Sequence, residues 1–264
     1  METLSRRYEV IPIGRDKLNL ENVEEVYRFF QEIDVDLIIH AGALTSVDLC
    51  EKEKEAAVKI NWLSTRSIAR AAESRKTALI YISTDYVFDG EKDAYMEWDF
   101  PNPICFYGKT KYFGEQEVIH SIYRHYIVRS SWIYGKGGKN FFSKLPQLLK
   151  TGKIKAVFDQ WSAPTYARDL AEALLKIIEE KPPYGVYHAP GGEGATPFTV
   201  AQEVSSLLNI STEIVPVRWQ DLNLPAKRPK RSILMNNALK NFIGVELPSW
   251  RESIRRFLHD EENS

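Results

Sequence analysis

Short apolar runs rich in β-branched residues alternate along this chain with longer segments in which apolar residues recur at helical spacing. The runs predict strands at Tyr8–Ile13, Leu37–Ala41, Ala78–Ser83, Tyr126–Arg129 and Ile154–Phe158. The intervening segments predict helices at Val23–Ile33, Glu53–Ser74, Tyr107–Ser121 and Phe141–Lys150. Continuous apolar strands are typical of a parallel sheet that helices cover on both faces, and repeated β-α-β order requires right-handed crossovers. The pattern therefore predicts an α/β fold with a Rossmann-like, doubly wound parallel sheet.

The pattern changes after about Ser162, where the predicted elements become shorter and the loops longer. Helices are predicted there at Ala167–Glu180, Thr199–Leu208 and Trp250–His259, and strands at Val186–Ala189 and Glu213–Val217. We expect residues 1–162 to form the Rossmann-like core. Residues 163–264 are expected to form mainly a small C-terminal α/β substrate-binding lobe, with some segments returning to the core. A ligand would then lie at the carboxyl ends of the strands.

Composition restricts the classes of function. The 264 residues are 44% hydrophobic and carry a net charge of -1, which favours a soluble globular protein with no general attraction to nucleic acid or membranes. We expect neither a membrane span nor a secretory signal. Cys50 and Cys105 do not form a disulfide or zinc pattern, and no His, Asp or Glu grouping has metal-ligand spacing. The expectation is a protein of the reducing cytoplasm without a metal site.

The clearest chemical signal is the segment YISTDYVFDG, followed by FYGKTKYFGE. Tyr107 and Lys111 are four residues apart at the start of a predicted helix, so their side chains share one helix face. An ammonium stabilises the phenolate of a nearby tyrosine, and the pair can therefore act as a general acid or base. Thr84 follows a predicted strand, and its hydroxyl could bind the same carbonyl oxygen. A Tyr-x-x-x-Lys match is weak by itself, but this is the chain's only one and it follows a strand that ends in hydroxyl groups.

Five segments extend this signal to a family. STDYVFDG, YGKTK, VRSSWIYG, DQWSAPT and PAKRPKRSIL occur in the order found in the dTDP-4-dehydrorhamnose reductase family. The chain resembles this family of extended short-chain dehydrogenases from about Tyr8 to its last helix. HAGALTSVDLCE is similar to the family's Ala-rich turn, which lies along the cofactor. Related epimerases and dehydratases usually carry Ser where this chain has Thr84. They also lack Trp132 and the pattern that runs from Asp159-Gln160 to Pro164-Thr165.

The resemblance implies an NADP(H)-dependent reductase of a nucleotide sugar. Tyr107 would protonate the sugar oxygen, and Thr84 would bind the C4 carbonyl oxygen. Lys111 would lower the pKa of Tyr107 and hold the nicotinamide ribose. The remaining positions that the resemblance implies fall into two groups. Those along the cofactor are Asn19, Leu20, Gly42, Ala43 and Thr45, and those at the substrate are Val47, Asp85, Tyr86, Trp132 and Arg228.

Four further residues have two interpretations each. Arg15 follows the first predicted strand and could contact the 2′-phosphate of NADP, with an ordinary surface arginine as the equal alternative. Asn61 lies in a mostly apolar predicted helix, which favours a structural hydrogen-bonding role over a catalytic one. His40 and His188 are in strand-like segments and are interpreted as packed side chains.

The oligomeric state is left open, with a homodimer as one option.

The start of the chain departs from the family pattern. Dinucleotide binding on this fold uses a first strand, a glycine-rich turn and a helix N-terminus, and none of these precedes Gly14. Tyr8–Ile13 matches the second strand of such a sheet, and METLSRR matches the end of the helix before it. We therefore expect the first strand and the glycine-rich loop to be missing. Three explanations are open: an incorrectly assigned start, a real truncation, or a truncated chain that serves as a partner-binding subunit.

The function implied by the resemblance is reduction of the 4-keto group of dTDP-6-deoxy-L-lyxo-4-hexulose to dTDP-L-rhamnose, with NADPH as the hydride donor. One alternative is reduction or epimerisation of another nucleotide sugar. The other is a non-catalytic regulatory subunit, because the regulatory subunit of methionine adenosyltransferase is similar to this reductase family. The sequence leaves the choice between NADP and NAD open.

Overall fold

The computed structural model describes residues 2–262. Its helices are α1 (Glu2–Ser5), α2 (Val23–Glu32), α3 (Val47–Lys52), α4 (Lys54–Ala57), α5 (Ser64–Ser74), α6 (Phe106–Ser121), α7 (Phe141–Leu149), α8 (Ala167–Glu180), α9 (Pro197–Leu207), α10 (Ala238–Ile243) and α11 (Trp250–Glu262). Its strands are β1 (Leu37–His40), β2 (Ala78–Thr84), β3 (His125–Ser130), β4 (Ile133–Tyr134), β5 (Lys153–Val157), β6 (Thr165–Tyr166), β7 (Gly185–His188) and β8 (Glu213–Val217). A π-helical turn (Val58–Leu63) joins α4 to α5, and short 3₁₀ turns cover Asp85–Val87 and Trp219–Leu222.

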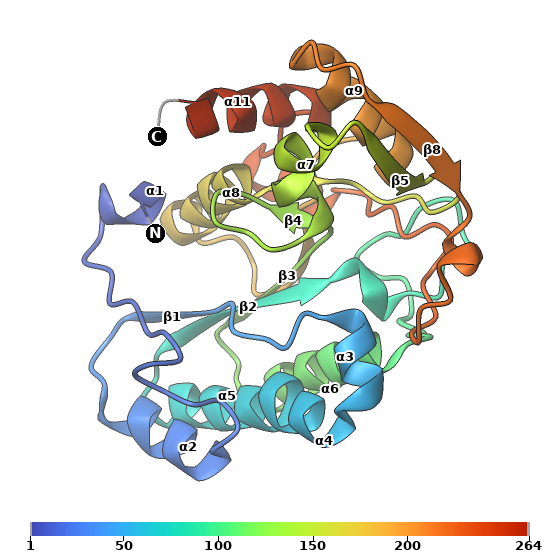
Figure 1. Cartoon of the computed structure of the whole chain (residues 1–264). Coiled ribbons are helices and arrows are strands. Elements are labelled where there is room, and N and C mark those ends of the chain that lie inside the picture. The colour runs from blue at the N-terminus through green and yellow to red at the C-terminus, as the bar shows by residue number, and fades with distance from the viewer. Residues whose placement is uncertain (1, 263–264) are drawn as a thin grey trace.

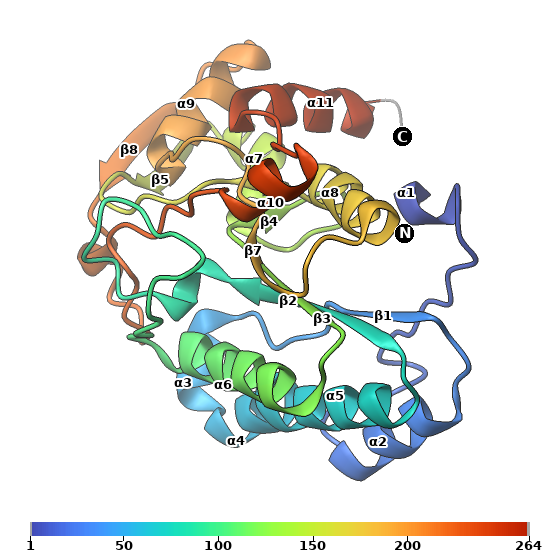
Figure 2. The ribbon, with the colours of Figure 1, turned by 180° about the vertical axis from the view of Figure 1, so that it is seen from behind.

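A four-stranded parallel sheet in the order β1-β2-β3-β7 forms the centre of the fold. Successive side chains of β2 face opposite sides of the sheet. Leu79 and Tyr81 pack against α2, α5 and α6, whereas Ile80 and Ile82 pack against α8 and α10. Figures 1 and 2 show these two sets of helices on opposite faces of the sheet. The predicted Rossmann-like, doubly wound parallel sheet is thus confirmed.

A second layer of structure lies beyond α8. Strand β5 pairs in parallel with β8, and β4 pairs with β6, while α7, α9 and α11 enclose an apolar cluster centred on the buried Trp250. The segment Ile154–Phe158 was expected in the core sheet, but β5 pairs with β8 instead. This lobe therefore draws on α7 and β5, which precede residue 163, and β7 from the C-terminal part joins the core sheet.

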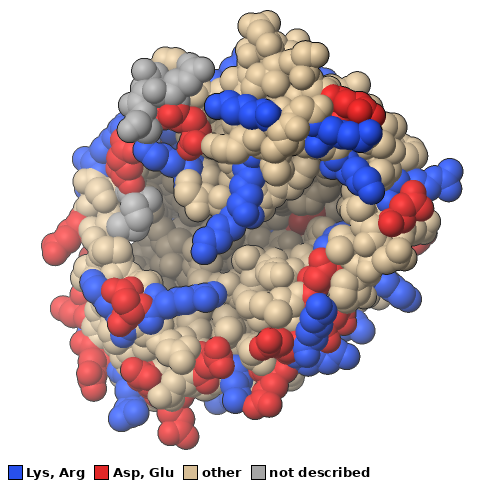
Figure 3. Space-filling model, in the orientation of Figure 1, with Lys and Arg blue, Asp and Glu red and all other residues tan. Residues whose placement is uncertain are grey.

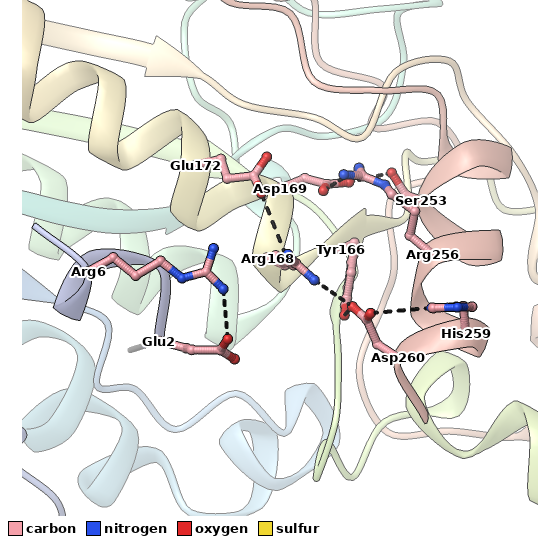
Figure 4. Close-up of polar contacts among 10 residues, drawn as sticks. All are labelled: Glu2, Arg6, Tyr166, Arg168, Asp169, Glu172, Ser253, Arg256, His259 and Asp260. Carbon is pink, nitrogen blue, oxygen red and sulfur yellow. Dashed lines mark hydrogen bonds and ion pairs between the residues drawn. The ribbon is translucent and has the colours of Figure 1, made fainter. Parts of the chain in front are cut away.

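Polar contacts fasten α11 to the start of α8 (Figure 4). The buried carboxylate of Asp169 accepts a hydrogen bond from the Ser253 hydroxyl and pairs with the Arg256 guanidinium. Tyr166 donates a hydrogen bond of 2.8 Å to Asp260 on α11. Because a buried carboxylate is stable only when its charge is matched, these contacts fix how the last helix lies on the lobe.

The prediction of a strand at Tyr8–Ile13 is wrong. This segment runs as irregular chain between α1 and α2, and its side chains Tyr8 and Ile11 are 43% and 47% exposed (Figure 1). A strand is stable only when a neighbour satisfies its backbone N–H and C=O groups. Among the described residues β1 forms one end of the sheet, and Tyr8–Ile13 does not pair with it.

Candidate active site

Strand β2 ends at Thr84, where the chain enters the 3₁₀ turn Asp85–Val87. The Thr84 hydroxyl oxygen accepts a hydrogen bond of 3.2 Å from the backbone N–H of Tyr86 and so caps this turn. Thr84 is buried at the carboxyl end of the parallel sheet, which is the edge where such sheets bind ligands. The capping contact fixes the position of the Thr84 hydroxyl before any ligand is bound.

Helix α6 brings Tyr107 to this strand end. Cys105 precedes the helix, and its Sγ accepts a hydrogen bond of 3.4 Å from the Gly108 N–H. Gly108 lies against the turn after β2, since a Cβ at this position would be 3.0 Å from the Tyr86 carbonyl carbon and closer still to its oxygen. This close approach requires glycine, and it brings Tyr107, the preceding residue, to the end of β2, where the Thr84 side chain acts on its phenol.

Burial controls the acidity of Tyr107. The residue as a whole is half-buried, and burial of its hydroxyl raises the pKa of Tyr107 above its ordinary value. A hydrogen bond with Thr84 lowers this pKa, and the Asp85 carboxylate raises it further. At neutral pH the phenol is therefore protonated, which suits a proton donor.

Lys111 lies one turn further along α6 and is almost fully buried. Its Nζ donates a hydrogen bond of 2.7 Å to the Ile82 carbonyl oxygen and lies 4.0 Å from the centre of the Tyr81 ring. Burial lowers the pKa of Lys111 to about 7, and the Glu115 carboxylate acts in the opposite direction. The hydrogen bond of Lys111 thus goes to β2 rather than to the Tyr107 phenol.

Of the residues expected at the substrate, Val47 and Tyr86 lie beside Tyr107, and Trp132 lies next to Tyr86. Val47 and Tyr107 pack against a buried cluster formed by Tyr86, Cys105 and Ala226, and the rings of Tyr86 and Tyr107 meet edge to face at 5.9 Å. Trp132 stacks on Phe142 at 5.1 Å, and its side chain lowers the pKa of the neighbouring Tyr86, which burial raises. Its φ of 41° is unusual for a bulky residue, and such strain persists only where the surroundings hold it.

Arg228 connects the C-terminal part of the chain to α3. Its guanidinium donates hydrogen bonds of 2.6 and 3.3 Å to the two carboxylate oxygens of Asp48 and lies over the Trp219 ring at 5.3 Å. Burial would raise the pKa of Asp48, but the hydrogen bonds and charge of Arg228 outweigh it and hold this pKa below its usual value. The sequence gives no signal for this pair, because the two residues are 180 positions apart.

Asp85 is in a different environment from the other residues expected at the substrate. It is 1% exposed, and its carboxylate accepts hydrogen bonds from the hydroxyls of Thr84 at 3.1 Å, Ser162 at 2.8 Å and Ser232. Burial raises the pKa of Asp85 to about 6, although the three hydroxyls lower it. Both oxygens are engaged within the protein, so Asp85 is not at the open position expected for a group that contacts a sugar.

Asn61 holds the turn that follows β1. Its side-chain amide accepts a hydrogen bond of 2.7 Å from the Leu44 N–H and donates hydrogen bonds of 3.1 Å to the Leu44 carbonyl and 3.0 Å to the Thr110 hydroxyl. It lies in the π-helical turn that divides the predicted helix Glu53–Ser74, and such turns often occur at functional sites. Asn61 thus joins the turn that carries Gly42, Ala43 and Thr45 to the helix that carries Lys111. This agrees with the structural role expected for it.

The other residues expected at the cofactor lie on the neighbouring loop before α2. Leu20 faces Gly42, where a Cβ would be 2.7 Å from the Leu20 Cδ1 atom. Asn19 is exposed, and its side chain accepts a hydrogen bond of 3.0 Å from the Glu21 N–H. Arg15 is exposed on the same loop. The structure therefore brings Leu20 and Gly42 together and leaves Arg15 and Asn19 at the surface.

Tyr107 and Lys111 suit the nicotinamide–ribose end of a nicotinamide dinucleotide better than its central pyrophosphate. The buried Lys111 ammonium next to the Tyr107 helix turn is a suitable donor for ribose hydroxyls. The described segment before β1, residues 2–36, contains no strand followed by a glycine-rich turn that would receive the pyrophosphate. The nicotinamide–ribose end therefore fits the site, and the described residues form no corresponding glycine-rich cradle for the pyrophosphate.

One face of the molecule suits an anionic ligand. Figure 3 shows a hollow between the two halves of the molecule with Lys and Arg side chains at its rim.

Within residues 2–262, no cluster of three or more His, Cys, Asp or Glu side chains could hold a metal ion, and no helix is long and apolar enough to span a bilayer. His40 and His188 are buried, and burial lowers the pKa of each to about 3. Both are neutral, packed side chains.

Comparison with known proteins places the chain in a family. The family model described as "RmlD substrate binding domain" matches residues 1–263. This match does not confirm the expectation that a first strand and a glycine-rich loop are missing. The spore coat polysaccharide biosynthesis protein SpsK of Bacillus subtilis is 32% identical over 259 residues, which cover 97% of this chain and 90% of that protein.

Two solved structures are similar over nearly the whole chain. The dTDP-4-dehydrorhamnose reductase of Bacillus anthracis, in complex with NADP, is 37% identical with a TM-score of 0.92, and the match covers 97% of this chain and 92% of that one. The dTDP-4-dehydrorhamnose reductase of Clostridium acetobutylicum is also 37% identical, with a TM-score of 0.93 and coverage of 99% and 93%. The chain belongs to the RmlD, or dTDP-4-dehydrorhamnose reductase, family and is an oxidoreductase of the extended short-chain dehydrogenase type.

Proposed function

We propose that this protein reduces the 4-keto group of dTDP-6-deoxy-L-lyxo-4-hexulose to give dTDP-L-rhamnose, with NADPH as the hydride donor. The observation that carries the proposal is the placement of Tyr107 against Thr84 at the end of β2, with Lys111 one helical turn further on. Membership of the family supports a nucleotide-sugar substrate. The Bacillus anthracis relative, whose structure contains NADP, supports the cofactor.

The three central residues divide the work of the reaction. When bound, NADPH supplies the hydride that reaches C4. Tyr107 donates its phenolic proton to the former carbonyl oxygen, since its raised pKa keeps it protonated at neutral pH. Thr84 turns its hydroxyl hydrogen from Asp85 to the same oxygen, binds it and orients it. Lys111 holds the nicotinamide ribose and, by its positive charge, favours the Tyr107 phenolate once the proton has left.

The other residues bind rather than react. Val47, Tyr86 and Trp132 enclose the sugar, because Val47 and Tyr86 lie beside the Tyr107 ring and Trp132 lies next to Tyr86. Arg228 binds the pyrophosphate of the nucleotide, since a guanidinium donates in parallel to phosphate oxygens. We place the cofactor along two neighbouring segments, Arg15 to Leu20 and Gly42 to Thr45. The C-terminal lobe provides most of the surface that encloses the substrate.

Steady-state assays with a panel of 4-keto sugar nucleotides test the proposal. We expect turnover of the dTDP sugar with NADPH, and turnover of a different sugar alone would refute the substrate assignment. Tyr107→Phe should lower kcat by about 10²- to 10⁴-fold because it removes the proton donor. NADPH affinity, measured by fluorescence titration, should stay nearly unchanged. Tyr112→Phe, on the same helix, is the matched control and should keep its activity.

A different nucleotide sugar is the second candidate, and one observation favours it. SpsK, named for spore coat polysaccharide biosynthesis, is as similar to this chain as several curated dTDP-4-dehydrorhamnose reductases, at 32% identity. The sugar panel tests this second candidate.

A further inference from the structure

The ammonium of Lys111 lies over an aromatic ring that has no part in the mechanism described above. Its Nζ is 4.0 Å from the centre of the Tyr81 ring, well inside the range of about 6 Å over which a ring face attracts a cation. Tyr81 is 0% exposed on β2, and Lys111 is 3% exposed on α6. Because both groups are out of contact with water, this attraction is stronger than at a surface. The ring therefore favours the charged form of Lys111.

The far end of the Tyr81 side chain is fixed between α6 and the π-helical turn. Its hydroxyl lies 3.4 Å from the backbone carbonyl oxygens of both Asn61 and Lys111 and donates to one of them at a time. Gly114 on α6 leaves the space for this hydroxyl, since a Cβ there would be 3.0 Å from the Tyr81 Cζ atom and closer still to its oxygen. The ring cannot turn away from Lys111 without withdrawing its hydroxyl from this position.

We propose that Tyr81 is a positioning residue, whose ring keeps the Lys111 ammonium charged and in place at the end of β2. The inference rests on the proposed reductase function, in which that ammonium holds the nicotinamide ribose. Lys111 donates a hydrogen bond of 2.7 Å to the Ile82 carbonyl oxygen, and an ammonium has three hydrogens. Consecutive residues of β2, Tyr81 and Ile82, thus hold the ammonium while hydrogens remain for the ribose.

A carboxylate near Lys111 is already matched by another cation. Glu115 lies one helical turn further along α6, and its charge raises the pKa of Lys111. Both of its carboxylate oxygens accept hydrogen bonds from Arg129 on β3, at 2.9 and 2.8 Å. This pairing weakens the attraction between Glu115 and Lys111, and it leaves a share of the stabilisation of the ammonium to the Tyr81 ring.

The titratable groups that face Lys111 from β1 and from the start of α6 are neutral. The His40 ring on β1 lies 5.5 Å from the Tyr81 ring, and burial together with the charge of Lys111 lowers the pKa of His40 to about 3. Tyr107 is protonated at neutral pH, because burial raises its pKa. Burial also lowers the pKa of Lys111 to about 7, so the loss of any one attraction removes the charge from a large share of the molecules at neutral pH.

The pH dependence of NADPH affinity tests this inference. Lys111 is charged below its pKa and neutral above it, so wild-type affinity, measured by fluorescence titration, should fall as the pH rises through about 7. Tyr81→Leu removes the ring face and should move the midpoint of this fall to lower pH by about one unit. Tyr81→Phe keeps the ring and should keep the wild-type midpoint. A purely structural role of Tyr81 would change the affinity by the same factor at every pH.

Leu79→Ala is the matched control for lost packing. Leu79 is equally buried on the same face of β2, two residues before Tyr81, and its truncation should lower the free energy of unfolding without moving the midpoint. If Tyr81→Leu does not fold, Tyr81→Met takes its place, because a flexible methionine fills irregular space and also lacks a ring.

Two results would overturn the inference: a wild-type midpoint in a folded Tyr81→Leu or Tyr81→Met protein, or an equal shift in Leu79→Ala. If the wild type neither binds NADPH nor turns over any of the sugars, the proposed function fails. The charge of Lys111 is then followed directly by the ¹⁵N shift of its Nζ. Titration at the same pH in the wild type and in the variant without the ring would overturn the inference on its own, and a midpoint about one unit lower in the variant would support it.

Discussion

Gly108 allows a sharp test of how helix packing positions the proton donor. A methyl group at this residue would stand 3.0 Å from the Tyr86 carbonyl carbon and closer still to its oxygen. Both neighbours are backbone atoms, so they cannot rotate away as a flexible side chain would. In Gly108→Ala the start of α6 must therefore move outward by more than about 1 Å, because the carbonyl oxygen is the nearer atom and must reach a normal contact distance. Tyr107, the preceding residue, moves with it and away from Thr84.

The size of the effect follows from this displacement. A misplacement of about 1 Å can lower a rate about 100-fold, and overpacking costs about 1–3 kcal/mol. Alanine is favoured over glycine within a helix by about 1 kcal/mol, which offsets part of that loss. We therefore expect Gly108→Ala to lose about 0–2 kcal/mol in the free energy of unfolding but about 100-fold in kcat.

The assay combines urea unfolding with initial rates at saturating NADPH. Lys109→Ala, at the exposed next position on the same helix, is the control and should match the wild type in both measurements. A folded Gly108→Ala protein with wild-type kcat would refute the reasoning, since the close approach of α6 to the Tyr86 backbone would then not determine where the phenol lies. Loss of folding alone would show up in the unfolding curve, not as a selective loss of kcat.

Three further predictions concern buried polar groups. Glu115 and Arg129 form a bidentate pair at 2.9 and 2.8 Å in a fully buried site. Glu115→Gln breaks this pair and should lower the free energy of unfolding, measured by urea titration, by about 3–5 kcal/mol. The control Glu213→Gln, in an exposed pair, should change it by less than about 1 kcal/mol. Asn61→Ala releases the turn after β1 and should weaken NADPH binding about 10-fold in a fluorescence titration, and unchanged affinity would contradict its holding role. Asp85 has a folded pKa of about 6, above its unfolded value, so its stabilising effect is complete below about pH 4 and is lost as the pH rises through 6. Asp85→Asn should therefore gain about 3 kcal/mol relative to the wild type between pH 4 and 7, and parallel unfolding profiles would contradict this.

Elements with strong local periodicity are predictable from this sequence. The helix at Ala167–Glu180 and the strand at Glu213–Val217 lie at the predicted residues, because a continuous apolar pattern and Pro182 after the helix define them locally. The Tyr107–Lys111 spacing likewise places both residues on α6. Each of these predictions depends on residues that are close together in the chain.

The features that sequence reasoning missed depend on distant residues. Tyr8–Ile13 has the composition of a strand, but a strand also needs a pairing partner, and composition does not supply one. The partners of Asp85 are 77 and 147 positions away, so nothing local indicates that its carboxylate is enclosed. The π-helical turn at Asn61 is also invisible to a helical pattern, because one extra residue changes the backbone without changing the apolar periodicity.

The ion pair between Arg228 and Asp48 has a consequence for the proposed pyrophosphate site. A diphosphate that reaches this guanidinium meets an anion already bound to it, so its binding is an exchange of partners and not an addition. Only the difference between the two attractions contributes to affinity, and the displaced carboxylate must find water or another donor. The pair therefore acts as an internal competitor that discriminates against weak monoanions. In the proposed complex it would also link the arrival of the nucleotide to the release of α3, the helix that follows the turn proposed to lie along the cofactor.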